Sequence, residues 1–291
     1  MKSILRLSMV IVVIFSAVAA DAATWYVRPG GGGDATNIQA GIDLATGGDV
    51  VVVEAGTYTG PGNLNISFSG KDITVMSESG PYQTVIDCQS SGRAFLFVSG
   101  ESFQAVLEGF TIRNGSATDG GAIYSDGASP TIRFNLFCNN TASTTGGAVH
   151  VRNGGPTIQN NTFDSNGAPS GGAIMLGPGS DSQFSQNIVC ASTSGAAFAC
   201  SGAGSGTFVY CNDLYANTGG DYVCAGSGGN NFSMDPLFCG IPGSGNFFLQ
   251  QTSPCTPSFS PCGAPIGALA VQCEVTATEN ASWGQIKTLY R

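Results

Sequence analysis

The chain has 291 residues, of which 43 are glycine and 10% are charged, and its formal net charge is −9 at pH 7. This balance argues against a nucleic-acid partner, because no basic patch is available to neutralise phosphates. Charged residues are well below the roughly 25% of an average domain, so Ser, Thr, Asn and Gly must cover the surface. The glycine content suits a fold with several tight turns per repeat.

Residues 1–22 are predicted to be a secretory signal peptide. Lys2 and Arg6 precede an apolar run from Leu7 to Ala20, and small residues follow. The alternative is a membrane anchor, but the run is shorter than the roughly 20 apolar residues that a span needs. We therefore expect a monomeric protein that is secreted or displayed at the cell surface, with no membrane span after signal cleavage.

Residues 23–48 are predicted to form a strand and a short capping helix. Ile38 and Ile42 recur at the spacing of one helix face, and a Gly-Gly pair ends the pattern. Asp34 or Thr36 is the expected N-cap. Such a helix would cover the open apolar end of a solenoid.

Residues 49–273 are predicted to form a solenoid, because they carry a repeat of about 26 residues. Gly-Gly-Ala-Ile or Gly-Gly-Ala-Val occurs three times, with its first glycines at Gly120, Gly146 and Gly171. Short runs of β-branched and aromatic residues alternate with Gly, Ser and Asn, and no helical pattern intervenes. We therefore expect an all-β chain forming a single right-handed parallel β-helix of about eight coils.

Residues one period apart should be neighbours in a parallel ladder, about 4.8 Å apart. Asn114, Asn140 and Asn166 follow one another at steps of 26 residues, so we expect their amides to form a structural ladder. The same spacing places Asp126 next to Arg152, which predicts a surface ion pair contributing at most about 1 kcal/mol.

The repeat resembles that of a known family. The Gly-Gly-Ala elements and the Phe-x-x-Asn elements at Phe137–Asn140 and Phe163–Asn166 resemble repeats of the polymorphic outer membrane protein family. The opening stretch Asp49–Tyr58 and the closing Asp235–Phe238 are similar to secreted right-handed β-helix proteins of the pectin-lyase-like superfamily. The resemblance covers roughly residues 24–273, and the superfamily it implies includes lyases, hydrolases and esterases.

Ten cysteines in an exported chain favour disulfides. Cys88 and Cys138 are interpreted as buried small hydrophobic residues. Three disulfide pairings are predicted: Cys200 with Cys224, Cys255 with Cys262, and Cys239 with Cys273.

Residues 274–291 differ in composition, and we expect a tail that either docks on the last coil or acts as a signal for export or attachment.

No residue pattern identifies a catalytic site. His150 is interpreted as a structural residue on a strand, because the sequence lacks the paired carboxylates or clustered bases of the enzymes of this fold. Arg113, Arg133 and Arg152 either form a basic row for an acidic glycan or are solvated surface residues. Arg133 is expected level with Leu107, so the three columns do not coincide.

No cofactor or metal is assigned, although Ca²⁺ is the ion that scattered acids would suit. Those acids are Asp119, Asp126, Asp164 and Asp181.

The first hypothesis is a non-catalytic solenoid for adhesion, glycan contact or an extracellular structural role, whose partner is an extracellular polysaccharide or a cell-surface component. The alternative is a carbohydrate-active enzyme, foremost a polysaccharide lyase on an acidic glycan. Net negative charge speaks against an anionic substrate.

Overall fold

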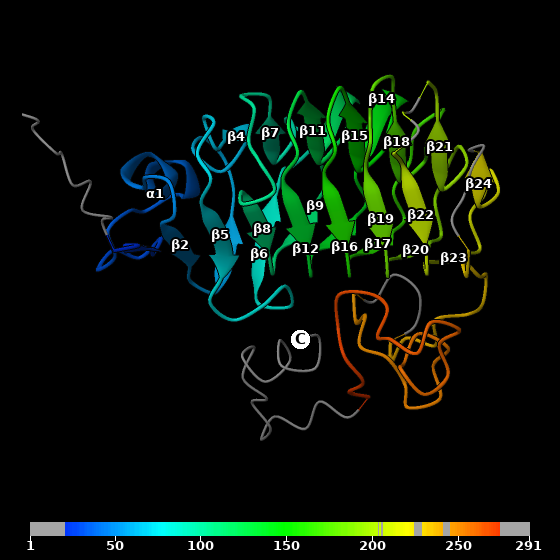
Figure 1. Cartoon of the computed structure of the whole chain (residues 1–291). Coiled ribbons are helices and arrows are strands. Elements are labelled where there is room, and N and C mark those ends of the chain that lie inside the picture. Colours follow the sequence, from blue (N-terminus) through cyan, green and yellow to red (C-terminus); the bar gives the residue numbers. More distant parts are fainter. Residues whose placement is uncertain (1–20, 203, 205, 224–228, 241–244, 274–291) are drawn as a thin grey trace, which may run out of the picture.

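The computed structural model describes residues 21–202, 204, 206–223, 229–240 and 245–273. Within them the chain forms a parallel β-solenoid of about seven turns with one short helix (Figure 1). The predicted all-β parallel fold is confirmed, with about seven turns where we expected about eight. Three predictions fall wholly or partly outside the described residues: the signal peptide, the tail over 274–291 and the Cys200–Cys224 disulfide.

Three sheets run along the solenoid, and all of their strand pairs are parallel. Sheet A contains β1 (Thr24–Val27), β2 (Val50–Val53), β5 (Thr74–Ser77), β8 (Val106–Glu108), β12 (Thr131–Arg133), β16 (Thr157–Gln159), β19 (Gln183–Ser185) and β22 (Phe208–Tyr210). Sheet B contains β3 (Gly56–Tyr58), β6 (Thr84–Asp87), β9 (Thr111–Arg113), β13 (Leu136–Cys138), β17 (Thr162–Asp164), β20 (Ile188–Cys190) and β23 (Asp213–Tyr215).

Sheet C completes each coil, and a short pair of strands lies in two of the coils. Sheet C contains β4 (Ile66–Ser67), β7 (Phe95–Phe97), β11 (Ile123–Asp126), β15 (Val149–Arg152), β18 (Ile174–Leu176), β21 (Phe198–Cys200) and β24 (Tyr222–Val223). The pair consists of β10 (Ser116–Asp119) and β14 (Thr141–Thr145). The only helix among the described residues is α1 (Ile38–Leu44).

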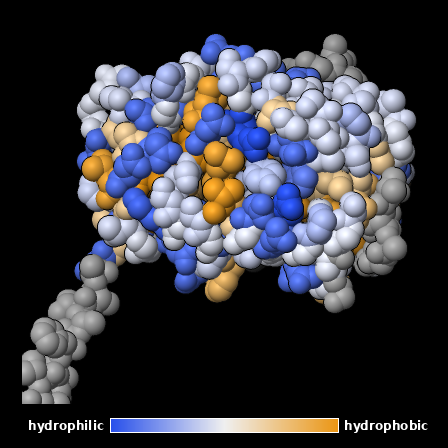
Figure 2. All heavy atoms as spheres, turned by 90° about the horizontal axis from the view of Figure 1, so that it is seen from above, coloured by the Kyte–Doolittle hydropathy of each residue, from blue (hydrophilic) through white to orange (hydrophobic). Residues whose placement is uncertain are grey.

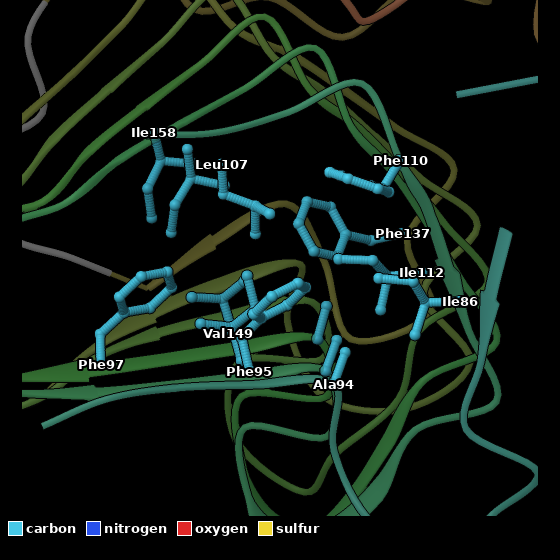
Figure 3. Packing of buried hydrophobic residues seen from close by; sticks show 14 of the residues in the cluster. Ile86, Ala94, Phe95, Phe97, Leu107, Phe110, Ile112, Phe137, Val149 and Ile158 are labelled. Atoms are coloured by element: carbon cyan, nitrogen blue, oxygen red, sulfur yellow. The ribbon is translucent and has the colours of Figure 1, made fainter. Parts of the chain in front are cut away.

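Side chains alternate between the two faces of each strand, so every strand contributes one set of side chains to the interior. Figure 3 shows this core, with Leu107 from sheet A, Ile112 and Phe137 from sheet B, and Phe95 and Val149 from sheet C converging on one space. All five are fully buried. Because the column is apolar in every coil, the stack encloses one continuous hydrophobic core.

Helix α1 closes the N-terminal end of this core. Its apolar face buries Ile38 and Ile42 completely. The N-cap is Asn37, whose Oδ1 accepts the Ala40 backbone N–H at 2.9 Å, so the prediction of Asp34 or Thr36 was wrong. An amide oxygen caps as well as a carboxylate or a hydroxyl does, and the chain becomes helical only after Asn37.

The Gly-Gly pair of the repeat has a steric cause. The first glycine of each pair has a positive φ, at +60° in Gly120 and +63° in Gly146. A Cβ on Gly120 would also overlap the carbonyl of Ile123. The second glycine packs on the next coil, since a Cβ on Gly147 would overlap the carbonyl of Gly172. The motif is therefore a requirement of turning and stacking.

The predicted asparagine ladder is partly wrong. Asn140 Nδ2 donates to Asn166 Oδ1 at 3.0 Å, and the Gly115 backbone N–H donates to Asn140 Oδ1 at 2.8 Å. Asn114 lies one position off this column, because the strands β9 and β13 align Thr111 with Leu136, a step of 25 residues. The Asn114 side chain instead donates to an Asp carboxylate of the preceding coil.

A second, longer ladder fills the turn between sheets A and B, and the sequence reasoning missed it. Each amide Nδ2 donates to the Oδ1 of the next asparagine at 2.9 to 3.2 Å. These side chains also satisfy backbone groups of the turn, as buried amides must. Its members are Asn135, Asn161, Asn187, Asn212 and Asn231.

The surface is dominated by weakly polar residues, as the composition indicated. The face shown in Figure 2 is mostly pale and blue, with hydrophobic atoms near its middle and toward one end. Among the described residues no helix has the length and apolar character needed to cross a membrane.

Candidate ligand-binding groove

The three candidate arginines do not form one site. Arg113 lies on β9 of sheet B, Arg133 on β12 of sheet A and Arg152 on β15 of sheet C. Each is ion-paired with an acid of the preceding coil: the nitrogen-to-oxygen distances are 3.0 Å to Asp87, 2.7 Å to Glu108 and 3.8 Å to Asp126, respectively. The predicted Asp126–Arg152 pair is therefore present, whereas a shared basic row is excluded by geometry.

Arg133 also corrects the predicted register of sheet A. It lies level with Glu108, and Ile132 lies level with Leu107. The step from β8 to β12 is 25 residues, so the assumed step of 26 shifted the predicted partners in β8 by one position. A shift of one residue exchanges the inner and outer faces of a strand.

His150 belongs to a hydrogen-bonded cluster on the outer face of sheet C. Its Nδ1 lies 2.6 Å from the Thr145 hydroxyl, which lies 2.6 Å from Asp119 Oδ1. Tyr124 of the preceding coil packs against the imidazole, with ring centroids 5.5 Å apart. Burial lowers the pKa of His150. The imidazole is therefore held by the hydrogen bond to Thr145 and by packing against Tyr124.

The acids considered for Ca²⁺ are not gathered together. Asp119 is on β10, Asp126 on β11 and Asp164 on β17, and Asp181 accepts the Gly206 backbone N–H in a separate turn. Across the described ranges, no group of three or more His, Cys, Asp or Glu side chains is arranged to hold a metal ion.

A groove lies on sheet B, where the end of the chain folds back over the strands. Residues 229–240 and 245–273, the C-terminal segment, cover the outer face of β13, β17, β20 and β23 (Figure 1). Apolar side chains hold the two together: Phe247 and Leu136 belong to one buried cluster, and Leu249 and Ile188 belong to another. The outward residues of these strands are therefore buried although they point away from the core.

Disulfides fix the C-terminal segment. Cys211, in the turn before β23, is bonded to Cys262, with Cα atoms 6.0 Å apart. Cys239 is bonded to Cys273 within the segment, as predicted. The predicted Cys255–Cys262 pair is wrong, because Cys255 faces sheet B as a buried thiol while Cys262 reaches the turn of the last coils.

The groove consists of two adjoining cavities between sheet B and the C-terminal segment. One has a volume of about 300 Å³ and a mainly apolar lining that includes Cys190, Tyr215 and Phe238. The other has a volume of about 350 Å³ and a more polar lining that includes Tyr82 and Arg113. The residues that line both cavities are Asp164, Gly245 and Phe247.

Asp164 lies at the junction of these cavities in an environment that disfavours its charge. It is 8% exposed, and burial raises its pKa. Its neighbours in the column are two thiols, Cys138 and Cys190. The Cys190 thiol donates to Oδ1 at 3.5 Å, and the Ser165 hydroxyl donates to Oδ2 at 2.9 Å. The predicted burial of Cys138 is confirmed.

Asp213 is a second buried acid, deeper under the C-terminal segment. It is 0% exposed and accepts hydrogen bonds from the Met234 backbone N–H at 3.0 Å and the Cys255 thiol at 3.2 Å. Burial raises its pKa to about 7. The acid thus joins the last coil to the segment that covers it.

Sequence reasoning did not find the groove. Asp164 was noted only as a scattered acid, and neither Tyr82 nor Phe247 carries a motif. One signal was available: Cys138, Asp164 and Cys190 are spaced by 26 residues each, so the period alone would have stacked them. Nothing in the period indicates that the C-terminal segment returns to this column.

One comparison with known proteins bears on this fold. The family model described as the Chlamydia polymorphic membrane protein (Chlamydia_PMP) repeat matches residues 136–152. The matched stretch includes β13, β14 and β15 with the Gly146-Gly147 turn, which confirms the resemblance of the repeat over this short region. No curated protein gives a match. The repeat, together with the Cys211–Cys262 and Cys239–Cys273 disulfides, indicates an extracytoplasmic surface protein.

Proposed function

We propose that this protein is a non-catalytic, glycan-binding solenoid of the cell exterior, and that its binding site is the groove on sheet B. One observation carries the proposal: two adjoining cavities of about 300 and 350 Å³ combine aromatic walls with planar amides. Concave sites with a mainly apolar lining and a few convergent polar groups are the usual form of small-ligand sites.

The lining matches the chemistry of sugars. A sugar ring presents an apolar C–H face and an edge of hydroxyl groups. Tyr82 and Tyr215 offer aromatic surface for the face, and Asn139 and Gln250 offer amide donors and acceptors for the edge. Two cavities in a row suit consecutive residues of a chain. Adhesion through an extracellular glycan follows from such a site on a surface protein.

The test is a glycan array, followed by calorimetry with each bound oligosaccharide, on the disulfide-bonded protein. Tyr82→Ala is expected to weaken binding at least tenfold, because the ring is 50% exposed at the groove. The matched control is Phe103→Ala, which removes an aromatic side chain that is 71% exposed and lines neither cavity. Equal effects of both variants would place binding elsewhere, and an array with no bound glycan would reject the proposed function. Unsaturated products from a uronate polymer would instead support the lyase alternative.

A further inference from the structure

The charge of the groove restricts its ligand. Of the described residues that line the cavity of about 300 Å³, Asp164 and Asp235 are acidic and none is Lys, Arg or His. The lining of the cavity of about 350 Å³ includes one cation, Arg113, whose Nε lies 3.0 Å from a carboxylate oxygen of Asp87 in an ion pair. The described lining of the groove therefore leaves its two acids without a counter-charge.

Asp164 is the acid that a ligand would meet at the junction of the two cavities. Phe163 is buried in the core, so the next side chain of β17 points outward into the groove. Asp164 is 8% exposed, and it belongs to none of the ion pairs among the described residues. The Cys190 thiol and the Ser165 hydroxyl each donate to one of its oxygens. A carboxylate oxygen has two acceptor sites, so both oxygens can accept a further bond from a ligand.

The surroundings of Asp164 favour a positively charged donor. Burial raises the pKa of this carboxyl, because its charge is removed from water without a cation among the described residues to replace the solvent. An ammonium group would supply that counter-charge, and its hydrogen bond to a carboxylate is stronger than that of a hydroxyl. Tyr215, level with Cys190 in the next strand, lines the same cavity with an aromatic face, and such faces attract cations. A ligand carboxylate would instead be repelled by both acids.

We propose that the groove selects a glycan of amino sugars, in which a protonated 2-amino group donates to the Asp164 carboxylate and Asp235 adds a second negative charge in the same cavity. This inference rests on the proposed function. A neutral hexose would place a hydroxyl group beside the buried carboxylate and leave its charge uncompensated. An amino sugar supplies the charge and keeps the ring face and the hydroxyl edge that suit the aromatic and amide groups of the groove.

Calorimetry with matched trisaccharides tests the selection at pH 6, where the sugar amino group is protonated. The β1,4-linked trimers of glucosamine and of glucose differ by the ammonium group that replaces a hydroxyl on each ring. We expect the glucosamine trimer to bind at least about tenfold more tightly, which is the gain of one charged hydrogen bond. The N-acetylglucosamine trimer keeps the nitrogen without its charge, so it is expected to bind more weakly than the glucosamine trimer by a similar factor.

The outcomes distinguish this inference from the proposed function. Equal affinities for the glucosamine and glucose trimers would overturn the inference and leave glycan binding intact. A failure of every glycan on the array, the glucosamine trimer included, would reject the proposed function itself.

Variants separate the contact with Asp164 from the effect of net charge. Asp164→Asn is expected to lower the affinity for the glucosamine trimer at least about tenfold and to leave that for the glucose trimer within about twofold. The matched control Asp181→Asn removes one negative charge from an exposed acid outside both cavities, so it is expected to change neither affinity. Equal losses in the two variants would indicate long-range attraction alone and overturn the inference.

A second variant keeps the test decisive if circular dichroism shows that Asp164→Asn does not fold. Asp235→Asn changes an exposed acid that lines the cavity of about 300 Å³. It is expected to weaken binding of the glucosamine trimer by about threefold or more and to leave binding of the glucose trimer unchanged. The same affinity for the glucosamine trimer in Asp235→Asn as in Asp181→Asn would overturn the inference.

Discussion

The central coils and the C-terminal segment satisfy their buried polar groups in opposite ways. In the coils, a buried amide such as Asn161 is hydrogen-bonded to its own copies, Asn135 and Asn187, in the adjacent turns. At the C-terminal segment, the buried acid Asp213 is held by a backbone N–H and the Cys255 thiol. The difference shows that the amide ladder needs no titratable group, whereas the acid whose pKa burial raises to about 7 lies where the repeat ends.

The same contrast is seen along one column of residues in sheet B. Its outward positions read Thr111, Leu136, Thr162 and Ile188 along successive coils, and then Asp213. Leu136 and Ile188 are covered by apolar side chains of the C-terminal segment, and the Thr162 hydroxyl accepts the Ala268 backbone N–H. The acid appears in the last coil, where the covering segment begins. The strongest dependence of stability on pH is therefore expected at this junction.

The largest expected effect is the pH dependence that Asp213 gives to the junction. Its pKa is about 7 in the folded protein, against an ordinary value of 3.8. The folded state therefore holds a proton that the unfolded state has lost between pH 4 and 7, so the contribution to stability is full below pH 4 and is lost as the pH rises through 7. The loss is on the order of 4 kcal/mol.

Chemical denaturation at pH 4 to 8 measures this effect, and Asp213→Asn is expected to remove most of the slope. The buried Asp164 adds to the slope in the same direction, because its pKa is also raised. Asp49 is the control, since hydrogen bonds lower its pKa to about 2 and its titration lies below this range. If Asp213→Asn leaves the slope unchanged, the contrast between coils and junction is wrong.

The next effect concerns the disulfide that ties the C-terminal segment to the coils. Replacing Cys211 and Cys262 with serine opens a loop with a sequence separation of 51 residues. The expected loss of stability is on the order of 3 kcal/mol, and it should weaken the packing of the C-terminal segment on the coils. The measurement is the rate of labelling of the Cys190 thiol, which the segment buries in the folded protein.

A second pair of cysteines provides the comparison for that experiment. Replacing Cys239 and Cys273 removes a disulfide within the segment and keeps its tether to the solenoid. We expect faster labelling of Cys190 in the first variant than in this one. Equal rates would mean that the apolar contacts alone hold the segment in place.

Within the coils, adding a single methyl group tests the steric explanation of the Gly-Gly motif. Gly147→Ala would place a Cβ against the carbonyl of Gly172 in the next coil, so stacking must yield. The expected loss is roughly 2 to 3 kcal/mol. Gly47→Ala is the matched control, because a Cβ there meets nothing within 4 Å. Thermal unfolding checks both variants, and equal stabilities would contradict the steric explanation of the Gly-Gly motif.

The sequence allowed the solenoid to be predicted because a stacked coil repeats its constraints at every turn. Gly146 and Gly171 recur for the same steric reason, and Asn140 and Asn166 for the same hydrogen bonds. The register failed at Asn114, where one step has 25 residues and the period alone cannot show which turn lost a residue.

The groove could not be predicted, because the contacts that form it are not periodic. Phe247 meets Leu136 only because the chain reverses after the last coil. The same reversal brings Cys262 to Cys211, while proximity in sequence had favoured Cys255. Distances between such residues depend on how a non-repetitive segment packs, and no spacing in the sequence records that packing.

The smallest expected effect is the difference in strength between two ion pairs. Each pair joins the last residues of two adjacent strands, one pair in sheet A and the other in sheet C. Arg133 lies 2.7 Å from Glu108, whose side chain is 4% exposed, whereas Arg152 lies 3.8 Å from Asp126, which is 33% exposed. Solvent screens the second pair, so a double-mutant cycle is expected to give less than about 0.5 kcal/mol for it and about 1 kcal/mol or more for the first. Raising the salt concentration should weaken mainly the exposed pair. If both cycles gave equal energies, burial of the acid would not set the strength of these pairs, and the coils would draw stability from surface charge as well as from their amide ladders.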